Sequence, residues 1–303
     1  MKRTIFFTPI IAFVFILCSC EREGVYAPEK RISSITHDEN GYYKEVWVWD
    51  KDLLREIYFQ NSNVSYRFYY NKKQLTAIHV FAQTNMYYQF TYDKQGKRLL
   101  SMDSYLSQND NMSARLFERT DFTYNDDGLI NGFETKHYWG KYKNCDQERH
   151  TQYILQLLFP IIPNTSPEFK HKGSGDYYST TASFNYKDGN ITDGLYIETF
   201  DTCYIHYSYT QIPNPFREFF HYAYLDPTVV NQSAHNSTMI LHATLEHHCH
   251  PQFSANYSED FDFSYETDKD GYPIKITRSM TISSENYPII DGGTQTYSIE
   301  YEQ

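Results

Sequence analysis

The sequence predicts an all-β fold, in which an antiparallel meander of hairpin repeats forms a large curved or barrel-like sheet. Two observations lead to this prediction. The chain of 303 residues contains 30 Tyr, 21 Phe and 3 Trp, and Tyr and Phe favour strands. A degenerate repeat also runs along the chain: two aromatic residues, an Asp or Asn and a short polar turn precede Leu or Ile. The elements are taken below in chain order.

The chain begins with an export signal. Lys2 and Arg3 precede an apolar stretch that leads into Leu17-Cys18-Ser19-Cys20. This is the layout of a secretory signal peptide. The small residue before Cys20 is typical of a bacterial lipoprotein signal, with Cys20 as the lipidated first residue of the mature chain. The apolar stretch is short for a membrane-spanning helix, which needs about 20 residues. Cleavage at another position, which would release a free secreted protein, is the alternative.

Residues 1–19 are therefore assigned to a lipoprotein signal peptide, residues 20–29 to a short tether, and residues 30–303 to a single β-repeat domain. Glu21 and Glu23 resemble the surface-export signal of lipoproteins from Bacteroides-type bacteria, although Arg22 interrupts the acidic run. We expect a protein that is lipid-anchored at a bacterial outer membrane, either periplasmic or surface-exposed.

Each repeat unit is predicted to be a β-hairpin. Its two aromatic residues lie two positions apart and so share one face of a strand. Asp-Gly or Asn-x-x-Gly then supplies a turn with positive φ, and the next apolar residue starts the returning strand. Trp49, Tyr70 and Tyr92 are spaced 21 and 22 residues apart, which is a repeat signature. The units are 47–53, 68–75, 90–99, 122–129, 184–191 and 263–274.

Insertions near residues 139–176 and 211–238 interrupt the repeat, and long insertions in a scaffold often carry function. Within the first, residues 153–163 could form a short helix or a buried strand, because periodicity does not distinguish them. If the two insertions meet over one face of the sheet, their aromatic side chains could stack on sugar rings. The alternative is a local mini-core. The candidate contacts are Trp139, Tyr142, Phe216, Phe219 and Phe220.

The segment around residues 245–250 is the candidate metal site. In a strand, Glu246, His248 and His250 share one face, and a His-x-His pair can bind zinc or copper if a neighbour supplies a third ligand. The alternative is a solvated histidine-rich strand end. The opposite face, directed toward a core, would carry Met239, Leu241, Ala243 and Leu245. Acidic turns elsewhere lack the full ligand set of a calcium loop, and we expect no cofactor.

Three cysteines remain besides Cys20, namely Cys145, Cys203 and Cys249. An exported protein can form disulfides, but the odd count leaves at least one thiol free or paired with another molecule. No C-x-x-C spacing supports a zinc knuckle or a thioredoxin-like site. The pairing stays open, and we favour small buried residues, because free cysteine is among the most buried residue types.

The formal net charge is −11 and becomes more negative when Lys2 and Arg3 are removed. Such a charge disfavours nucleic acid and anionic membrane surfaces as partners. The sequence lacks a Gly-x-Ser-x-Gly elbow, a P-loop and a Gly-rich dinucleotide motif. Its carboxylates are numerous, so a glycosidase pair could exist, but no pair stands out.

The repeat units resemble the Tyr-Asp repeats of RHS-type wall and toxin-shell proteins. The whole arrangement resembles a family of Bacteroides-type lipoproteins of unknown function, in which a lipobox precedes a Tyr-rich meander with a porin-like sheet. Residues 209–215, with the pattern Tyr-x-x-x-x-Asn-Pro, and residues 297–301 also fit that family. The resemblance covers most of residues 30–303. It implies a fold and carries no active site.

The sequence therefore predicts a membrane-tethered envelope lipoprotein with a non-enzymatic role, either binding a glycan or a protein or acting as a structural module. No nucleic acid partner is expected. The alternative is a polysaccharide hydrolase that uses paired carboxylates, which would lie roughly 5–10 Å apart.

Overall fold

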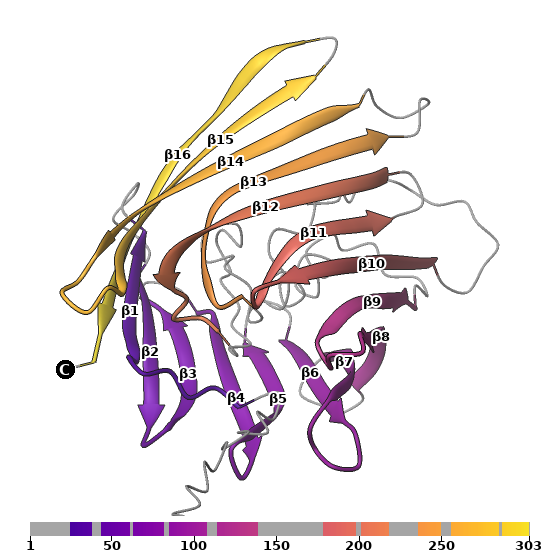
Figure 1. Ribbon diagram of the computed structural model, residues 1–303. Coiled ribbons are helices and arrows are strands. Elements are labelled where there is room, and N and C mark those ends of the chain that lie inside the picture. Colours follow the sequence, from indigo (N-terminus) through magenta and orange to yellow (C-terminus); the bar gives the residue numbers. More distant parts are fainter. Residues whose placement is uncertain are drawn as a thin grey trace, which may run out of the picture.

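The computed structural model describes residues 25–37, 44–60, 63–81, 85–107, 114–138, 178–197, 201–217, 236–249, 256–284 and 287–302. These residues form sixteen antiparallel strands and no helix. Each strand pairs with the next along the chain, and β1 pairs with β16, so that the sheet closes into a barrel (Figure 1). The predicted all-β, barrel-like meander is confirmed. Within the described residues, no helix is long and apolar enough to cross a membrane.

The strands of the first half of the barrel are short. They are β1 (Ile32–His37), β2 (Lys44–Asp50), β3 (Leu53–Phe59), β4 (Ser65–Asn71), β5 (Gln74–Phe81), β6 (Asn85–Tyr92), β7 (Leu99–Ser107) and β8 (Ala114–Tyr124).

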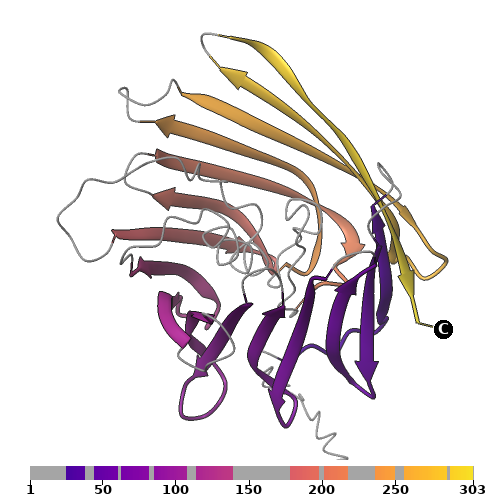
Figure 2. The same cartoon turned by 180° about the vertical axis from the view of Figure 1, so that it is seen from behind.

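Most strands of the second half are longer, as Figure 2 shows. They are β9 (Ile130–His137), β10 (Tyr178–Lys187), β11 (Asn190–Ile197), β12 (Asp201–Pro213), β13 (Thr238–Cys249), β14 (Tyr257–Thr267), β15 (Pro273–Ser284) and β16 (Tyr287–Tyr301).

The two ends of the barrel differ. Even-numbered strands run toward one end, where tight turns join β2 to β3, β4 to β5, β6 to β7, β8 to β9, β10 to β11 and β14 to β15. We call this the tight-turn end. The chain enters β1 and leaves β16 there as well, and the amide of Glu302 donates to the carbonyl of Arg31 at 2.8 Å. The opposite end, where β1 leads to β2 and β9 to β10, is called the far end.

The repeated Gly and Asp residues form the tight turns as predicted. Gly96, Gly128, Gly189 and Gly271 all have positive φ, between 66° and 86°. At two of these turns the Asp or Asn that directly follows the Tyr accepts a backbone hydrogen bond through its side chain. The Asp93 carboxylate accepts from the Lys97 amide at 2.7 Å, and at the second turn the Asn125 side chain accepts from the Leu129 amide at 2.9 Å. Local turn chemistry therefore sets the register of each hairpin.

Both aromatic residues of each repeat unit face the interior, and the second one makes the same contact around the barrel. The Tyr70 hydroxyl donates to the Leu54 carbonyl at 2.8 Å, one hairpin back. In the first unit Trp49 replaces Tyr, and its indole N–H donates to the Ile32 carbonyl at 2.8 Å. The corresponding pairs are Tyr92 with Leu75, Tyr124 with Leu99, Tyr186 with Ile130, Tyr209 with Ile191, Tyr265 with Ile240 and Tyr301 with Pro273.

One hydrophobic cluster contains buried residues from all sixteen strands. Strands on opposite sides of a closed barrel share only its inner face, so this cluster fills the interior. Alternate residues point outward, as in β4, where Tyr66 and Phe68 are buried whereas Arg67 and Tyr69 are exposed. The tyrosines therefore place their rings inside and pair their hydroxyl groups with backbone carbonyls.

Strand β13 follows the predicted alternation only in part. Met239, Ala243 and Leu245 are buried, but Leu241 is 46% exposed, so its predicted inward orientation is wrong. The ladder between β12 and β13 shifts register between Ser208 and Tyr209, opposite this position. A bulge adds one residue to one strand and reverses the facing of the residues beside it, which local pattern does not reveal.

The segment assigned to a tether is part of the folded domain from residue 25 onward. Tyr26 is buried in the core cluster, and its hydroxyl donates to the Pro215 carbonyl at 2.8 Å. Its ring packs at 5.7 Å from the Trp49 ring. The segment at residues 153–163 lies outside the described residues, whereas residues 215–217 form a turn.

Candidate functional site

The candidate metal ligands Glu246 and His248 lie on the outer face of β13, as the alternation predicted. Both are exposed, and the His248 ring meets the Tyr204 ring edge-on at 5.3 Å. His250 lies outside the described residues. The described part of the chain contains no group of three His, Cys, Asp or Glu side chains that could hold a metal ion. The zinc or copper site stays a prediction.

The neighbouring His247 is buried, and it organises a polar cluster inside the barrel near the far end. We call this the His247 cluster; its members are Asp201, Cys203, His247, Cys249 and Tyr257. Cys203 lies opposite His247 in the ladder of β12 and β13, and Asp201 lies opposite Cys249. Tyr257 lies opposite His247 on β14. Three adjacent strands therefore bring these side chains together.

The geometry of the cluster assigns a hydrogen-bonding role to both imidazole nitrogens of His247. Nδ1 lies 2.7 Å from an Asp201 carboxylate oxygen, and Nε2 lies 3.8 Å from the Cys203 sulfur. Because a carboxylate only accepts, Nδ1 donates to Asp201. The Cys203 thiol lies within hydrogen-bonding distance of Nε2 and, at 3.7 Å, of the Tyr204 carbonyl. The Tyr257 ring stacks on the imidazole with centroids 4.2 Å apart and planes 4° apart. The Cys249 thiol lies 3.9 Å from the other Asp201 oxygen.

An aligned Asp, His and Cys has the composition of a cysteine hydrolase site, but the electrostatics oppose that chemistry. Burial, followed by the nearby carboxylate of Asp201, raises the pKa of the Cys203 thiol. A nucleophilic cysteine needs an electropositive and partly exposed environment that lowers its pKa. Cys203 is fully buried instead, so its thiol stays protonated at neutral pH. The arrangement has the properties of a structural cluster.

The adjacent Glu259 is also perturbed. Burial raises the pKa of its carboxyl, while His247 and Arg278 oppose that shift. The carboxyl group therefore holds its proton to a higher pH than an exposed glutamate does.

Two further histidines pair with buried carboxylates near the far end. The Glu118 carboxylate, which is fully buried, lies 2.6 Å from His137 Nδ1, and His137 Nε2 lies 3.0 Å from the Thr180 hydroxyl. Glu45 is also fully buried and lies 3.5 Å from His37 Nε2. Sequence reasoning missed all three pairs. The one available signal was a histidine at or near the end of β1, β9 and β13, which is weak.

Among the candidate ligand contacts, only Phe216 lies in the described part of the chain. Phe216 is 3% exposed and packs against Trp47 with ring centroids 6.4 Å apart. Phe216 is therefore a core residue, as the mini-core alternative predicts for this position. Trp139, Tyr142, Phe219 and Phe220 lie outside the described residues.

The strand order also places the two insertions apart. The insertion near residues 139–176 follows β9 and leaves the barrel at the far end, whereas the one near 211–238 follows β12 and leaves at the tight-turn end.

The cysteine expectations are tested in part. Cys203 carries a free thiol and is the small buried residue that the sequence favours. Cys145 and the proposed lipidation site Cys20 lie outside the described residues.

Two comparisons with known proteins found no match: no family model matches the chain, and no curated protein does. The fold is similar to two solved structures. One is a porin-like protein from Bacteroides vulgatus, with 8% identity, a TM-score of 0.46 and coverage of 90% of this chain and 99% of that chain. The other is a porin-like protein from Bacteroides uniformis, with 13% identity, a TM-score of 0.48 and coverage of 92% and 100%.

Proposed function

We propose that this chain is a lipid-anchored envelope protein whose barrel lies in water beside the membrane and performs a non-enzymatic binding or structural role. The observation that carries the proposal is the distribution of side chains across the barrel wall. Apolar and aromatic residues fill the inside, and charged pairs cover the outside. A membrane-spanning barrel has the opposite distribution, with an apolar outer band about 25 Å tall.

Charged pairs occupy the outer face around most of the barrel. Arg67 on β4 lies 3.1 Å from Glu56 on β3, and Lys44 on β2 lies 2.8 Å from Glu300 on β16. The other outward pairs are Arg119 with Asp121, Lys136 with Glu134, His206 with Asp193, His242 with Asp262 and Lys275 with Glu266.

Each of these charges would be costly against lipid. An Arg or Lys on the lipid face near the bilayer midplane destabilises a barrel by about 2–4 kcal/mol. In water the same side chains remain solvated and make such pairs at little cost. A lipid on Cys20 would then be what holds the protein at the membrane, and several acyl chains make such anchoring stable.

The described polar residues support a non-enzymatic role. The arrangement of Asp201, His247 and Cys203 contains a buried thiol whose pKa is raised. A glycan or protein partner fits the envelope location. The polysaccharide hydrolase remains an alternative without a specific geometric observation in its favour.

The Cys20→Ala variant tests anchoring and barrel placement together. It should lack the lipid by N-terminal mass, leave the membrane fraction and stay folded and monomeric without detergent. Cys249→Ala is the matched control and should remain at the membrane. If Cys20→Ala stays in the membrane fraction and needs detergent to remain soluble, the barrel itself spans the bilayer and the proposal is wrong.

A further inference from the structure

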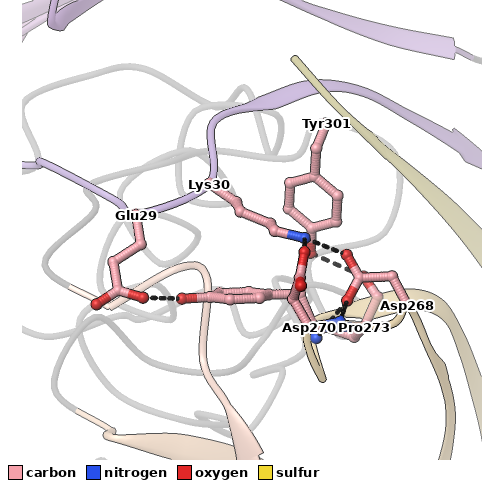
Figure 3. A network of polar contacts seen from close by, with 7 residues as sticks. Glu29, Lys30, Asp268, Asp270, Pro273 and Tyr301 are labelled. Atoms are coloured by element: carbon pink, nitrogen blue, oxygen red, sulfur yellow. Dashed lines mark hydrogen bonds and ion pairs between the residues drawn. The ribbon is translucent and has the colours of Figure 1, made fainter. Parts of the chain in front are cut away.

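The N-terminal segment is held firmly at the tight-turn end of the barrel. Lys30 Nζ lies 2.5 Å from carboxylate oxygens of both Asp268 and Asp270, in the turn between β14 and β15 (Figure 3). The Tyr272 hydroxyl donates to the Glu29 carboxylate at 2.6 Å. The Lys30 ammonium also lies 5.2 Å from the centre of the Tyr272 ring. These contacts fix the place where the chain enters the barrel.

Two more contacts attach the same segment to other parts of this end. Arg31 lies 2.7 Å from Asp52 in the turn between β2 and β3, and its guanidinium covers the Trp49 ring at 5.5 Å. Tyr26 reaches the carbonyl of Pro215, which follows β12. The segment therefore contacts the turns of three hairpins, and it cannot swing away while these contacts hold.

The covalent chain then limits how far this end can lie from an anchored Cys20. Six Cα-to-Cα steps separate Cys20 from Tyr26, and at no more than about 3.6 Å per step they span at most about 22 Å. Strands β15 and β16 contain 12 and 15 residues, which corresponds to about 40–50 Å at about 3.3 Å per residue. The tether therefore keeps Tyr26, at the tight-turn end, within about 22 Å of an anchored Cys20, whereas the far ends of β15 and β16 lie about 40–50 Å along their strands from that end.

The tight-turn end also carries a local concentration of positive charge. We call it the basic rim, and it comprises six exposed side chains on the three neighbouring turns that join β2 to β3, β4 to β5 and β6 to β7. They are Lys51, Lys72, Lys73, Lys94, Lys97 and Arg98.

The acidic residues on those turns are engaged within the protein. Asp50 lies 3.3 Å from Arg55, and Asp52 is the partner of Arg31 and, at 3.6 Å, of the rim residue Lys73. Backbone amides of its own turn hold the pKa of the Asp93 carboxyl below its usual value. The turn after β8 carries Asp126 and Asp127, while Lys187 beside Asp188 after β10 and Lys269 between Asp268 and Asp270 after β14 are balanced by acidic neighbours. Among the described tight turns, basic residues therefore outnumber acidic ones only on the β2–β7 side.

We propose that the tight-turn end faces the anchoring membrane and that the basic rim contacts its anionic phospholipid headgroups. This inference rests on the proposed lipidation of Cys20. The formal net charge of −11 would repel an anionic surface, and the orientation that brings the basic rim nearest the lipid reduces this repulsion. Because the Debye length is about 8 Å at physiological ionic strength, only charges close to the headgroups matter. The far end, with its three carboxylate–histidine pairs, then faces away from the membrane.

Lysine acetylation of the full lipidated protein tests the inference. Reaction rates at each lysine are compared between detergent solution and vesicles of phosphatidylethanolamine and phosphatidylglycerol. The basic-rim lysines should react at least threefold more slowly in the vesicles. Lys44 and Lys136, which lie on strands near the far end, are the internal controls and should react at unchanged rates. Equal rates at the rim, or equal slowing at the rim and at the controls, would overturn the inference.

A variant separates the charge contribution from mere proximity. The affinity for vesicles of phosphatidylglycerol and of phosphatidylcholine is measured in the Cys20→Ala background, where the lipid anchor is absent. The triple variant Lys51→Gln, Lys72→Gln and Lys94→Gln should lose the preference for phosphatidylglycerol. The control, Lys44→Gln with Lys136→Gln near the far end, should retain it. If both variants retain that preference, the rim does not recognise anionic headgroups.

The mass of the mature N-terminus distinguishes a failure of the proposed function from a failure of the inference about the basic rim. An unlipidated N-terminus in the native protein contradicts the proposed function. The contact between the basic rim and the lipid is then decided by the vesicle affinities alone: a rim-dependent and salt-sensitive preference supports it, and the lack of such a preference contradicts it.

Discussion

Removing one tyrosine hydroxyl from the ring of repeat contacts should weaken the barrel by a predictable amount. In Tyr70→Phe the ring stays in place and no cavity forms, so the change isolates the hydrogen bond of 2.8 Å to the Leu54 carbonyl. A neutral hydrogen bond of this kind contributes about 1 kcal/mol net. We expect that loss in the free energy of unfolding and a decrease in Tm of about 2 °C for a chain of this size.

The adjacent residue provides a matched control. Tyr69 has the same chemistry on the same strand, but it points outward and is 41% exposed. Tyr69→Phe should change stability by less than about 0.5 kcal/mol, as most surface substitutions do. Both variants are measured by urea unfolding, and an unchanged m-value confirms that native compactness is preserved.

Because the same hydroxyl-to-carbonyl hydrogen bond recurs around the barrel, several of these bonds can be removed in one variant. Tyr70, Tyr124 and Tyr301 lie on β4, β8 and β16, at least four strand positions apart around the barrel. At about 4.8 Å per strand they are too far apart to couple. The triple Tyr→Phe variant should therefore lose about 3 kcal/mol. A loss below 1 kcal/mol, or an equal loss in Tyr69→Phe, would refute the hydroxyl ring as a source of stability.

Three other predictions follow. Glu259→Gln should raise Tm at pH 7 and have no such effect below pH 4. Burial raises the pKa of the Glu259 carboxyl, so the contribution of this carboxyl to folding stability is present below its unfolded pKa and is lost as the pH rises. Equal gains in Tm at both pH values would contradict this. In maleimide labelling, Cys203 should react only in urea; rapid native labelling would show an accessible thiolate. Trypsin should cleave the N-terminal segment of the Lys30→Gln variant faster than that of the Lys275→Gln variant, because Lys30 binds Asp268 and Asp270. Equal cleavage rates would mean that other contacts hold the segment.

Much of the fold could be predicted because the determining signals are local. Two aromatic residues at positions 68 and 70 share a strand face by the geometry of the strand alone. An Asp-Gly pair such as Asp188-Gly189 specifies a turn through its own backbone preferences, and both residues have positive φ. The repetition of these signals predicted a meander, and the structure confirms it.

The polar clusters of the candidate site were harder to predict from the sequence than the fold was, for a physical reason. The sequence marked His248 and His250 by their spacing, but the buried member of that segment is His247, whose partner Asp201 is 46 residues away. Likewise, Tyr26 and Pro215 meet across 189 residues. Such contacts depend on which strands the closed barrel makes neighbours, and no short pattern encodes that.

By itself, the sequence determined the strands, the tight turns, the sharing of one strand face by each aromatic pair and the predicted export signal, because each depends on residues close together in the chain. Only the tertiary structure decided the rest. Closure of the barrel placed the aromatic face inside and the charges outside, a bulge turned Leu241 outward, and strand order sent the two insertions to opposite ends. These features arise from pairing between distant strands, whose register is settled by the whole sheet rather than by any one segment.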